Sequence, residues 1–93
     1  MNFARVLAES GLTKIELGEL FGVSRQTIHG WAFVGPPRVN SLLARQAEVI
    51  TAALLVAVDR GLLPLEAMDK DARRERVKKM AARLQGLKPA PAR

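Results

Sequence analysis

Apolar residues recur along the chain at the spacing of amphipathic helices, in five separate stretches. In the first of them, Phe3, Val6 and Leu7 share one face. The composition is rich in Ala, Leu, Arg and Glu and only 4% aromatic, which favours helices over strands. The sequence therefore predicts an all-α protein of five helices. The expected helices cover residues 2–10, 13–21, 24–32, 41–60 and 69–85.

The second and third stretches meet at a tight turn and carry clear end signals. Thr13 followed by Glu16 forms the capping-box pattern, in which each side chain satisfies a backbone N–H at the start of a helix. Gly22 can adopt the left-handed conformation that ends a helix, and Ser24 can cap the next one. We expect the remaining caps at Asn2, at Asn40 or Ser41, and at Asp69 or Asp71.

The third stretch has two contrasting faces. Ile28, Trp31 and Ala32 fall together at i, i+3 and i+4, which predicts a buried side. Trp31 is expected in the core rather than against a nucleic-acid base, because Ile28 shares its face. The opposite side carries polar groups and the bare backbone of one glycine: Arg25, Gln26, His29 and Gly30.

Residues 12–31 resemble the helix-turn-helix of the lambda-repressor and Cro-like family of DNA-binding domains. The run F-G-V-S-R-Q-T-I-x-x-W fits the second half of that motif closely, and the apolar and small positions Leu17, Gly18, Phe21, Gly22, Val23, Ile28 and Trp31 also agree. Gly18 is a departure, since the family usually has alanine there. Glycine still permits a close helix approach but weakens its own helix by about 1 kcal/mol.

The resemblance implies that the third helix enters the major groove of DNA. We expect Arg25, Gln26 and His29 to meet base edges, because arginine pairs with guanine and glutamine with adenine. Gly30 would remove bulk where this helix comes nearest the duplex. The expected contacts to the sugar-phosphate backbone are Lys14, Ser24, Thr27 and Arg38.

Charge is unevenly distributed, although the net charge of +6 suits a polyanionic partner. Residues 1–35 hold three cations and three anions, whereas residues 64–93 hold nine cations and four anions. Residues 1–35, which include the expected DNA-contacting helix, therefore have no net charge, whereas residues 64–93 are basic. The basic face of the last helix is expected either to be solvated while that helix covers the preceding one, or to attract phosphates beside the binding site.

The fourth stretch is apolar on every side, with Thr51 the only polar residue between positions 49 and 58. A helix of this kind requires cover all round, and the apolar run is too short to span a membrane. Either the last helix of the same chain or a second copy of the protein could bury this stretch, and the sequence does not decide between them. We favour a homodimer, with the contact formed by Ile50, Ala53, Leu54, Ala57 and Val58.

The sequence offers little for catalysis. There is no cysteine, and His29 is the only histidine, so a cysteine-based or histidine-rich metal site is not expected. No glycine-rich phosphate-binding motif is present. We expect no enzyme activity, no cofactor, no metal and no small-molecule effector. No signal peptide or membrane segment is expected, and the expected setting is the cytoplasm of a bacterium, or a plasmid or phage.

Together these observations predict a lambda-repressor-like domain organised as a DNA-binding head (1–37), a helical core and dimerisation region (38–86) and a flexible tail (87–93). The expected function is a homodimeric repressor of transcription on a two-fold symmetric operator in double-stranded DNA. One alternative is the DNA-recognition subunit of a phage packaging or recombination complex. Another is a protein-interaction module without DNA contacts, which the neutral head favours.

Overall fold

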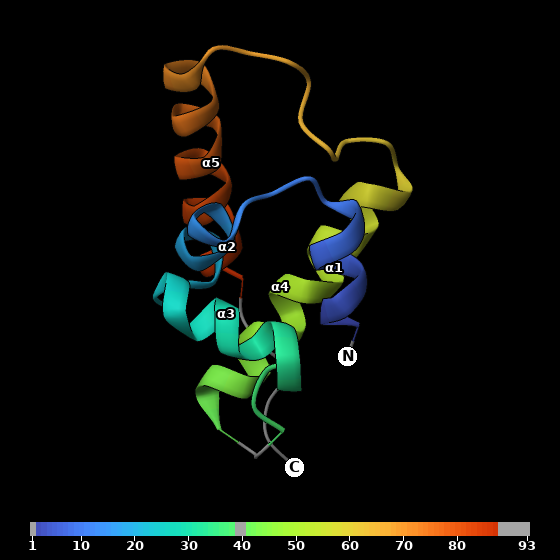
Figure 1. Ribbon diagram of the computed structural model, residues 1–93, viewed down its shortest axis with the longest axis vertical. Helices are drawn as coiled ribbons and strands as arrows, with labels where there is room; N and C mark the ends of the chain where they lie inside the picture. Colours follow the sequence, from blue (N-terminus) through green and yellow to red (C-terminus); the bar gives the residue numbers. More distant parts are fainter. Residues whose placement is uncertain (1, 39–40, 88–93) are drawn as a thin grey trace.

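A computed structural model describes residues 2–38 and 41–87, and Figure 1 shows its arrangement. Five helices and no strand occur in this part of the chain, so the all-α prediction is confirmed. The helices are α1 (Phe3–Glu9), α2 (Lys14–Phe21), α3 (Arg25–Val34), α4 (Leu42–Asp59) and α5 (Lys70–Gln85). Within residues 2–38 and 41–87, none of the helices is long and apolar enough to cross a membrane.

Side-chain caps set most of the helix starts. The capping box at α2 is confirmed: Thr13 Oγ1 accepts from the Glu16 N–H at 3.1 Å, and a Glu16 carboxylate oxygen accepts from the Thr13 N–H at 2.9 Å. The other side-chain caps are Ser24 at α3, Ser41 at α4 and Asp69 at α5. The expectation for Asn2 is wrong, because its side chain makes no capping hydrogen bond. The alternative cap Asn40 lies outside the described residues.

Three aromatic rings hold the first three helices together. Phe3, Phe21 and Trp31 come from α1, α2 and α3, and each pair meets edge to face with ring centroids 5.5–5.7 Å apart. Edge-to-face pairs stabilise a core beyond the area they bury, by about 0.5–1.5 kcal/mol each. Trp31 is 7% exposed, which confirms its expected place in the core.

A single hydrophobic cluster extends across all five helices. It joins the aromatic rings to Ile50 and Leu54 of α4 and to Val77 and Leu84 of α5. The core therefore continues across the boundary expected between residues 37 and 38, and the head shares its interior with the two longer helices.

The interior position of α4 changes the expectation for dimerisation. Ile50 is 0% exposed and Leu54 is 1% exposed in the single chain, so the prediction that these two form a surface contact is wrong. They pack into the core that α4 shares with α1 and α2. The helix is not covered all round either, since Leu42 and Val56 remain exposed. The other three residues of the expected contact, Ala53, Ala57 and Val58, are partly buried.

Most contacts of α5 are with α2 rather than with the preceding helix α4. Val77, Ala81 and Leu84 of α5 are buried, as the narrow apolar stripe in the sequence predicts. Two side chains fix α5 to the two ends of α2. Arg73 binds Glu16 at the start of α2, and the Gln85 amide donates to the Glu19 and Leu20 carbonyls near its end, at 2.6 and 3.3 Å.

Candidate functional site

The N-terminal half of α3 presents polar side chains to solvent. Ser24 Oγ accepts from the Thr27 N–H at 3.1 Å and so begins the helix. From that start the helical period turns Ile28 (0% exposed) and Trp31 into the core. The residues expected to read bases therefore lie on the free side, and Arg25, Gln26, His29 and Gly30 are all exposed.

The turn before α3 brings two backbones very close together. Gly22 has φ 72° and ends α2, and the Val23 N–H donates to the Gly18 carbonyl at 2.9 Å. A Cβ placed on Gly18 would lie 2.8 Å from the Val23 carbonyl oxygen. The absence of a side chain at position 18 thus allows the turn to approach α2 closely.

His29 is supported from two sides. Lys14 Nζ lies 2.9 Å from His29 Nδ1, and the Phe33 ring meets the imidazole edge to face at 5.1 Å between centroids. Because the lysine ammonium can only donate, Nδ1 must accept and the proton of the neutral ring must sit on Nε2. His29 therefore offers an N–H donor on the exposed side of α3. The contact with His29 also explains why Phe33 is placed at the surface, where it is 77% exposed.

The hydroxyls at the start of α3 are already engaged with each other. Ser24 Oγ and Thr27 Oγ1 lie 2.9 Å apart, in addition to the cap itself. The first backbone N–H groups of a helix have no partner within the helix, so those of Arg25 and Gln26 face outward from its N-terminus. The helix start is thus better suited to hold a phosphate through backbone N–H groups than through the two hydroxyls.

Arg38 is placed apart from the start of α3. It is exposed and lines a hollow at the other end of that helix, together with Trp31, Phe33, Val34 and Pro36. Lys14, by contrast, is joined to the exposed side of α3 through His29. The structure thus brings together seven of the eight residues expected to contact DNA and separates Arg38 from them.

Two cations of α5 lie beside the start of α2. Lys70 and Arg74 of α5 line a hollow with Thr13, Ile15 and Glu19 of the α2 region. In the sequence they belong to the basic final third, far from the neutral head. The fold of α5 onto α2 brings their charge beside Thr13 and Ile15, and no local signal in the sequence could have shown this proximity.

The carboxylate of Glu16 is held in place from two directions. Arg73 binds it through two nitrogens, with Nε 2.6 Å from Oε2 and Nη2 2.8 Å from Oε1, and also donates to the Gly11 carbonyl at 3.0 Å. The hydrogen bonds from Arg73, with a smaller contribution from the Thr13 backbone, lower the pKa of Glu16 below its ordinary value. Glu16 thus stays ionised and pairs with Arg73, and the other charged residues that line this hollow are Lys70, Arg74 and Glu19.

No group of three or more His, Cys, Asp or Glu residues that could hold a metal ion occurs among the described residues. Comparison with known proteins identifies no relative: no family model matches the chain, and no curated protein or solved structure matches it. The function must therefore be inferred from the arrangement of the exposed side of α3.

Proposed function

We propose that this protein binds double-stranded DNA through a helix-turn-helix formed by α2 and α3, with α3 in the major groove. The observation that supports the proposal best is the exposure of Arg25 and Gln26 at the start of a helix whose other side is fixed in the core by Ile28 and Trp31. A helix presented in this way can enter the groove without any change in the fold.

Each exposed side chain has a matching base edge. Arg25 can donate two hydrogen bonds to guanine O6 and N7, and Gln26 can pair with adenine N6 and N7. His29 can donate through Nε2 to a base acceptor or to a phosphate. Gly30 leaves the surface open, with no atom within 4 Å of the position a Cβ would take, so the duplex can approach the helix closely there.

Phosphate binding supplies the sequence-independent share of affinity. The N-terminus of α3 favours an anion through its free N–H groups and its dipole. Lys14 adds one positive charge, and Lys70 and Arg74 of α5 extend the cationic surface beyond α2. These two side chains would add positive charge beside residues 1–35, whose own composition is neutral.

One copy of α3 offers few base contacts. Two bidentate pairs contribute about 2–6 kcal/mol of discrimination, which reaches only the lower part of the range of about 4–10 kcal/mol by which specific binding exceeds non-specific binding. We therefore propose a homodimer on a two-fold symmetric operator, with the two α3 helices about 34 Å apart in successive major grooves. Occupancy of such a site beside a promoter would repress transcription.

A fluorescence-anisotropy titration at several salt concentrations tests the proposal, using random-sequence duplex and a duplex selected for tight binding. We expect salt-dependent binding to both. Lys14→Ala should weaken both equally and reduce the slope of log affinity against log salt by about 1. Arg60→Ala removes an equal charge at the far end of α4 and serves as the control. Absence of salt-dependent binding would reject the DNA-binding role.

Sedimentation of the protein with the selected duplex tests the dimer separately. The proposal predicts two chains for each duplex and an inverted repeat in the selected sequence. One chain for each duplex, with a site that lacks symmetry, would contradict the homodimer while leaving the DNA-binding role of α3 in place.

A further inference from the structure

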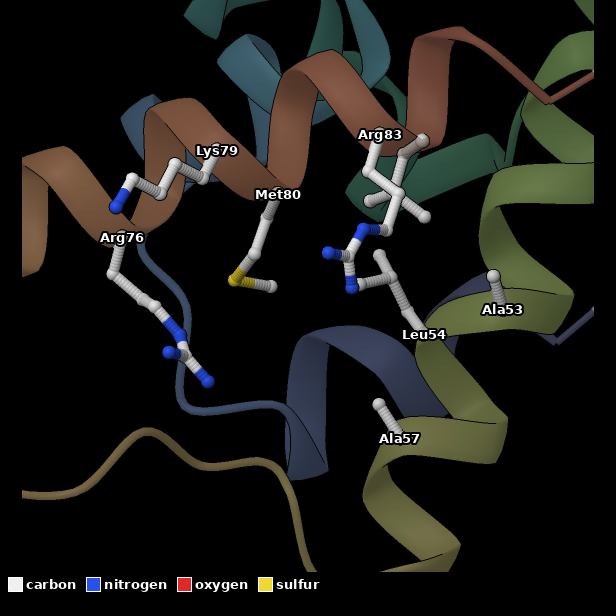
Figure 2. Close-up of a pocket in the computed structure, with 8 residues that line it drawn as sticks. Ala53, Leu54, Ala57, Arg76, Lys79, Met80 and Arg83 are labelled. Atoms are coloured by element: carbon white, nitrogen blue, oxygen red, sulfur yellow. The ribbon is translucent and has the colours of Figure 1, made fainter.

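A groove of about 230 Å³ lies between α4 and α5 (Figure 2). Lys70 and Arg74 line a different hollow of α5. The proposed DNA contact does not use the groove. No acidic residue lines it. The lining consists of three residues of α4 and five of α5: Ala53, Leu54, Ala57, Arg76, Lys79, Met80, Arg83 and Leu84.

The floor of the groove is apolar and has room for a visiting side chain. Leu54 and Leu84 belong to the core and close the bottom. Ala53 and Ala57 lie one turn apart on α4, and their short side chains leave space on that side of the groove. Met80 is only partly buried and points into the groove in Figure 2. Methionine is flexible and polarisable, so it adapts to apolar groups of different shape.

Three cations line the groove beside this apolar floor. Figure 2 shows Arg76 and Arg83 extending from α5 on either side of Met80, and Lys79 on the same helix with its ammonium turned away from Met80. All three are exposed, and none makes an ion pair within residues 2–38 and 41–87. Their neighbours on the same helix differ, since Arg73 binds Glu16 and Lys78 lies 3.8 Å from Glu75. The groove thus combines exposed apolar surface with uncompensated positive charge.

We propose that this groove binds an acidic, amphipathic helix of a partner protein. Arg76 and Arg83 are seven residues apart, which spans about 10 Å, or two helical turns. A visiting helix with apolar residues at i, i+3, i+4 and i+7 could place them on Met80, Ala53 and Ala57. Glutamates or aspartates flanking that stripe would then meet Arg76, Lys79 and Arg83.

The size and charge of the groove favour this occupant over others. The volume is below the 300–1,000 Å³ or so typical of sites that enclose a small molecule, and it suits one or two apolar side chains of a docked segment. The chain's own final residues, K-P-A-P-A-R, are cationic and contain no acid to meet the three cations. The interaction does not depend on DNA binding, because the exposed start of α3 contributes no residue to the groove.

The test is an NMR titration of the ¹⁵N-labelled full-length protein with a synthetic helical peptide of about 16 residues. The peptide carries Leu at i, i+3, i+4 and i+7 and Glu on both flanks, and a matched peptide has Gln in place of every Glu. We expect saturable shifts of the Ala53, Ala57 and Met80 amides with the Glu peptide only. Absence of saturation, or equal binding of the Gln peptide, would overturn the proposal.

Two triple variants separate the groove from general attraction between opposite charges. Arg76→Gln/Lys79→Gln/Arg83→Gln should weaken peptide binding at least about tenfold, whereas Lys70→Gln/Arg74→Gln/Lys78→Gln, which removes three charges from the other side of α5, should change it by less than about twofold. For DNA binding, the Lys70/Arg74/Lys78 variant should lose more affinity than the Arg76/Lys79/Arg83 variant. Equal losses of peptide binding, or a greater loss of DNA binding from the groove variant, would contradict the assignment.

A substitution on α4 tests the apolar wall without changing α5. Ala53→Arg should obstruct the groove and abolish the saturable shifts, whereas Ala52→Arg, on the exposed neighbouring position, should leave them unchanged. Sedimentation of the protein alone completes the test. If the chain forms a dimer that the groove variant converts to a monomer, the groove is a self-association surface and the proposal is wrong.

Discussion

The two helices on either side of the Gly22 turn are held in different ways. α2 has α5 along its length, with Arg73 bound at its start and Gln85 at its end, and four of its eight residues are buried. α3 is fixed from one side only, chiefly by Ile28 and Trp31. Its other side carries side chains that no core contact requires. The fold thus uses α2 as a rigid support and α3 as the presented element.

The same contrast appears at two glycines in helix interiors. A Cβ on Gly18 of α2 would collide with the Val23 carbonyl, whereas one on Gly30 of α3 would meet nothing within 4 Å. Packing therefore favours a glycine at position 18. Packing does not require one at position 30, where glycine weakens α3 by about 1 kcal/mol relative to alanine. A weak position that packing does not require is consistent with a function for the exposed side of α3.

The largest expected effect comes from the buried side of α3. Trp31→Ala should lower the free energy of unfolding by about 3–5 kcal/mol, because it removes a ring that contacts both Phe3 and Phe21. Arg25→Ala on the exposed side should change it by less than about 0.5 kcal/mol. Urea denaturation measures both. Similar losses for the two variants would show that the two sides of α3 are not distinct.

A second prediction concerns the support of α2. Arg73→Met retains the aliphatic stem but removes both hydrogen bonds to Glu16 and the one to Gly11, and should cost about 1–3 kcal/mol of stability. Arg74→Met, at the adjacent exposed position, is the matched control and should cost less than about 0.5 kcal/mol. Equal melting temperatures for the two variants would contradict the role given to Arg73.

The same ion pair predicts a pH dependence. The pKa of Glu16 is lowered in the folded protein, mainly by the hydrogen bonds from Arg73. A depressed carboxylate pKa stabilises the fold above the ordinary value of 4.5, and that stability is lost as the pH falls through the folded-state value. Urea titrations should show a constant gap between wild type and Arg73→Met from neutral pH to about pH 5, and a narrowing gap below it. A gap that does not depend on pH would argue against the pairing.

The smallest effects should come from the two glycines. Gly18→Ala should destabilise by about 1–2 kcal/mol, because a backbone shift is needed to relieve the collision with Val23. Gly30→Ala should instead stabilise by up to about 1 kcal/mol while weakening DNA binding, because its methyl group would stand between α3 and the duplex. Thermal unfolding and DNA titration of both variants measure the two effects. Unchanged DNA binding by Gly30→Ala would show that the duplex does not approach the helix there.

The sequence was sufficient for the features that depend on local signals. The capping box at Thr13 and Glu16, the left-handed Gly22, the cap at Ser24 and the buried Trp31 all follow from neighbours within a few residues, and the structure confirms them. Five helices also follow from periodicity. The roles of Arg25 and Gln26 toward DNA remain predictions.

Features that depend on how the helices pack could not be obtained in this way. An apolar helix such as α4 gives the same pattern whether a second copy or its own chain covers it, so Ile50 and Leu54 were misassigned to a dimer contact. Arg73 looks like any other cation of α5 until that helix lies against Glu16. The pairing of Lys14 with His29, 15 residues apart, likewise depends on the angle at the Gly22 turn.

The most direct test of the central claim is selection of binding sites from a randomised duplex library, carried out in parallel with the wild-type protein and with Arg25→Ala. The wild type should select a guanine at one position of each half-site, and the variant should lose the preference at that position alone, at a cost of about 1–3 kcal/mol on the preferred site. An identical preference at every position in the two selections would contradict the reading role of α3.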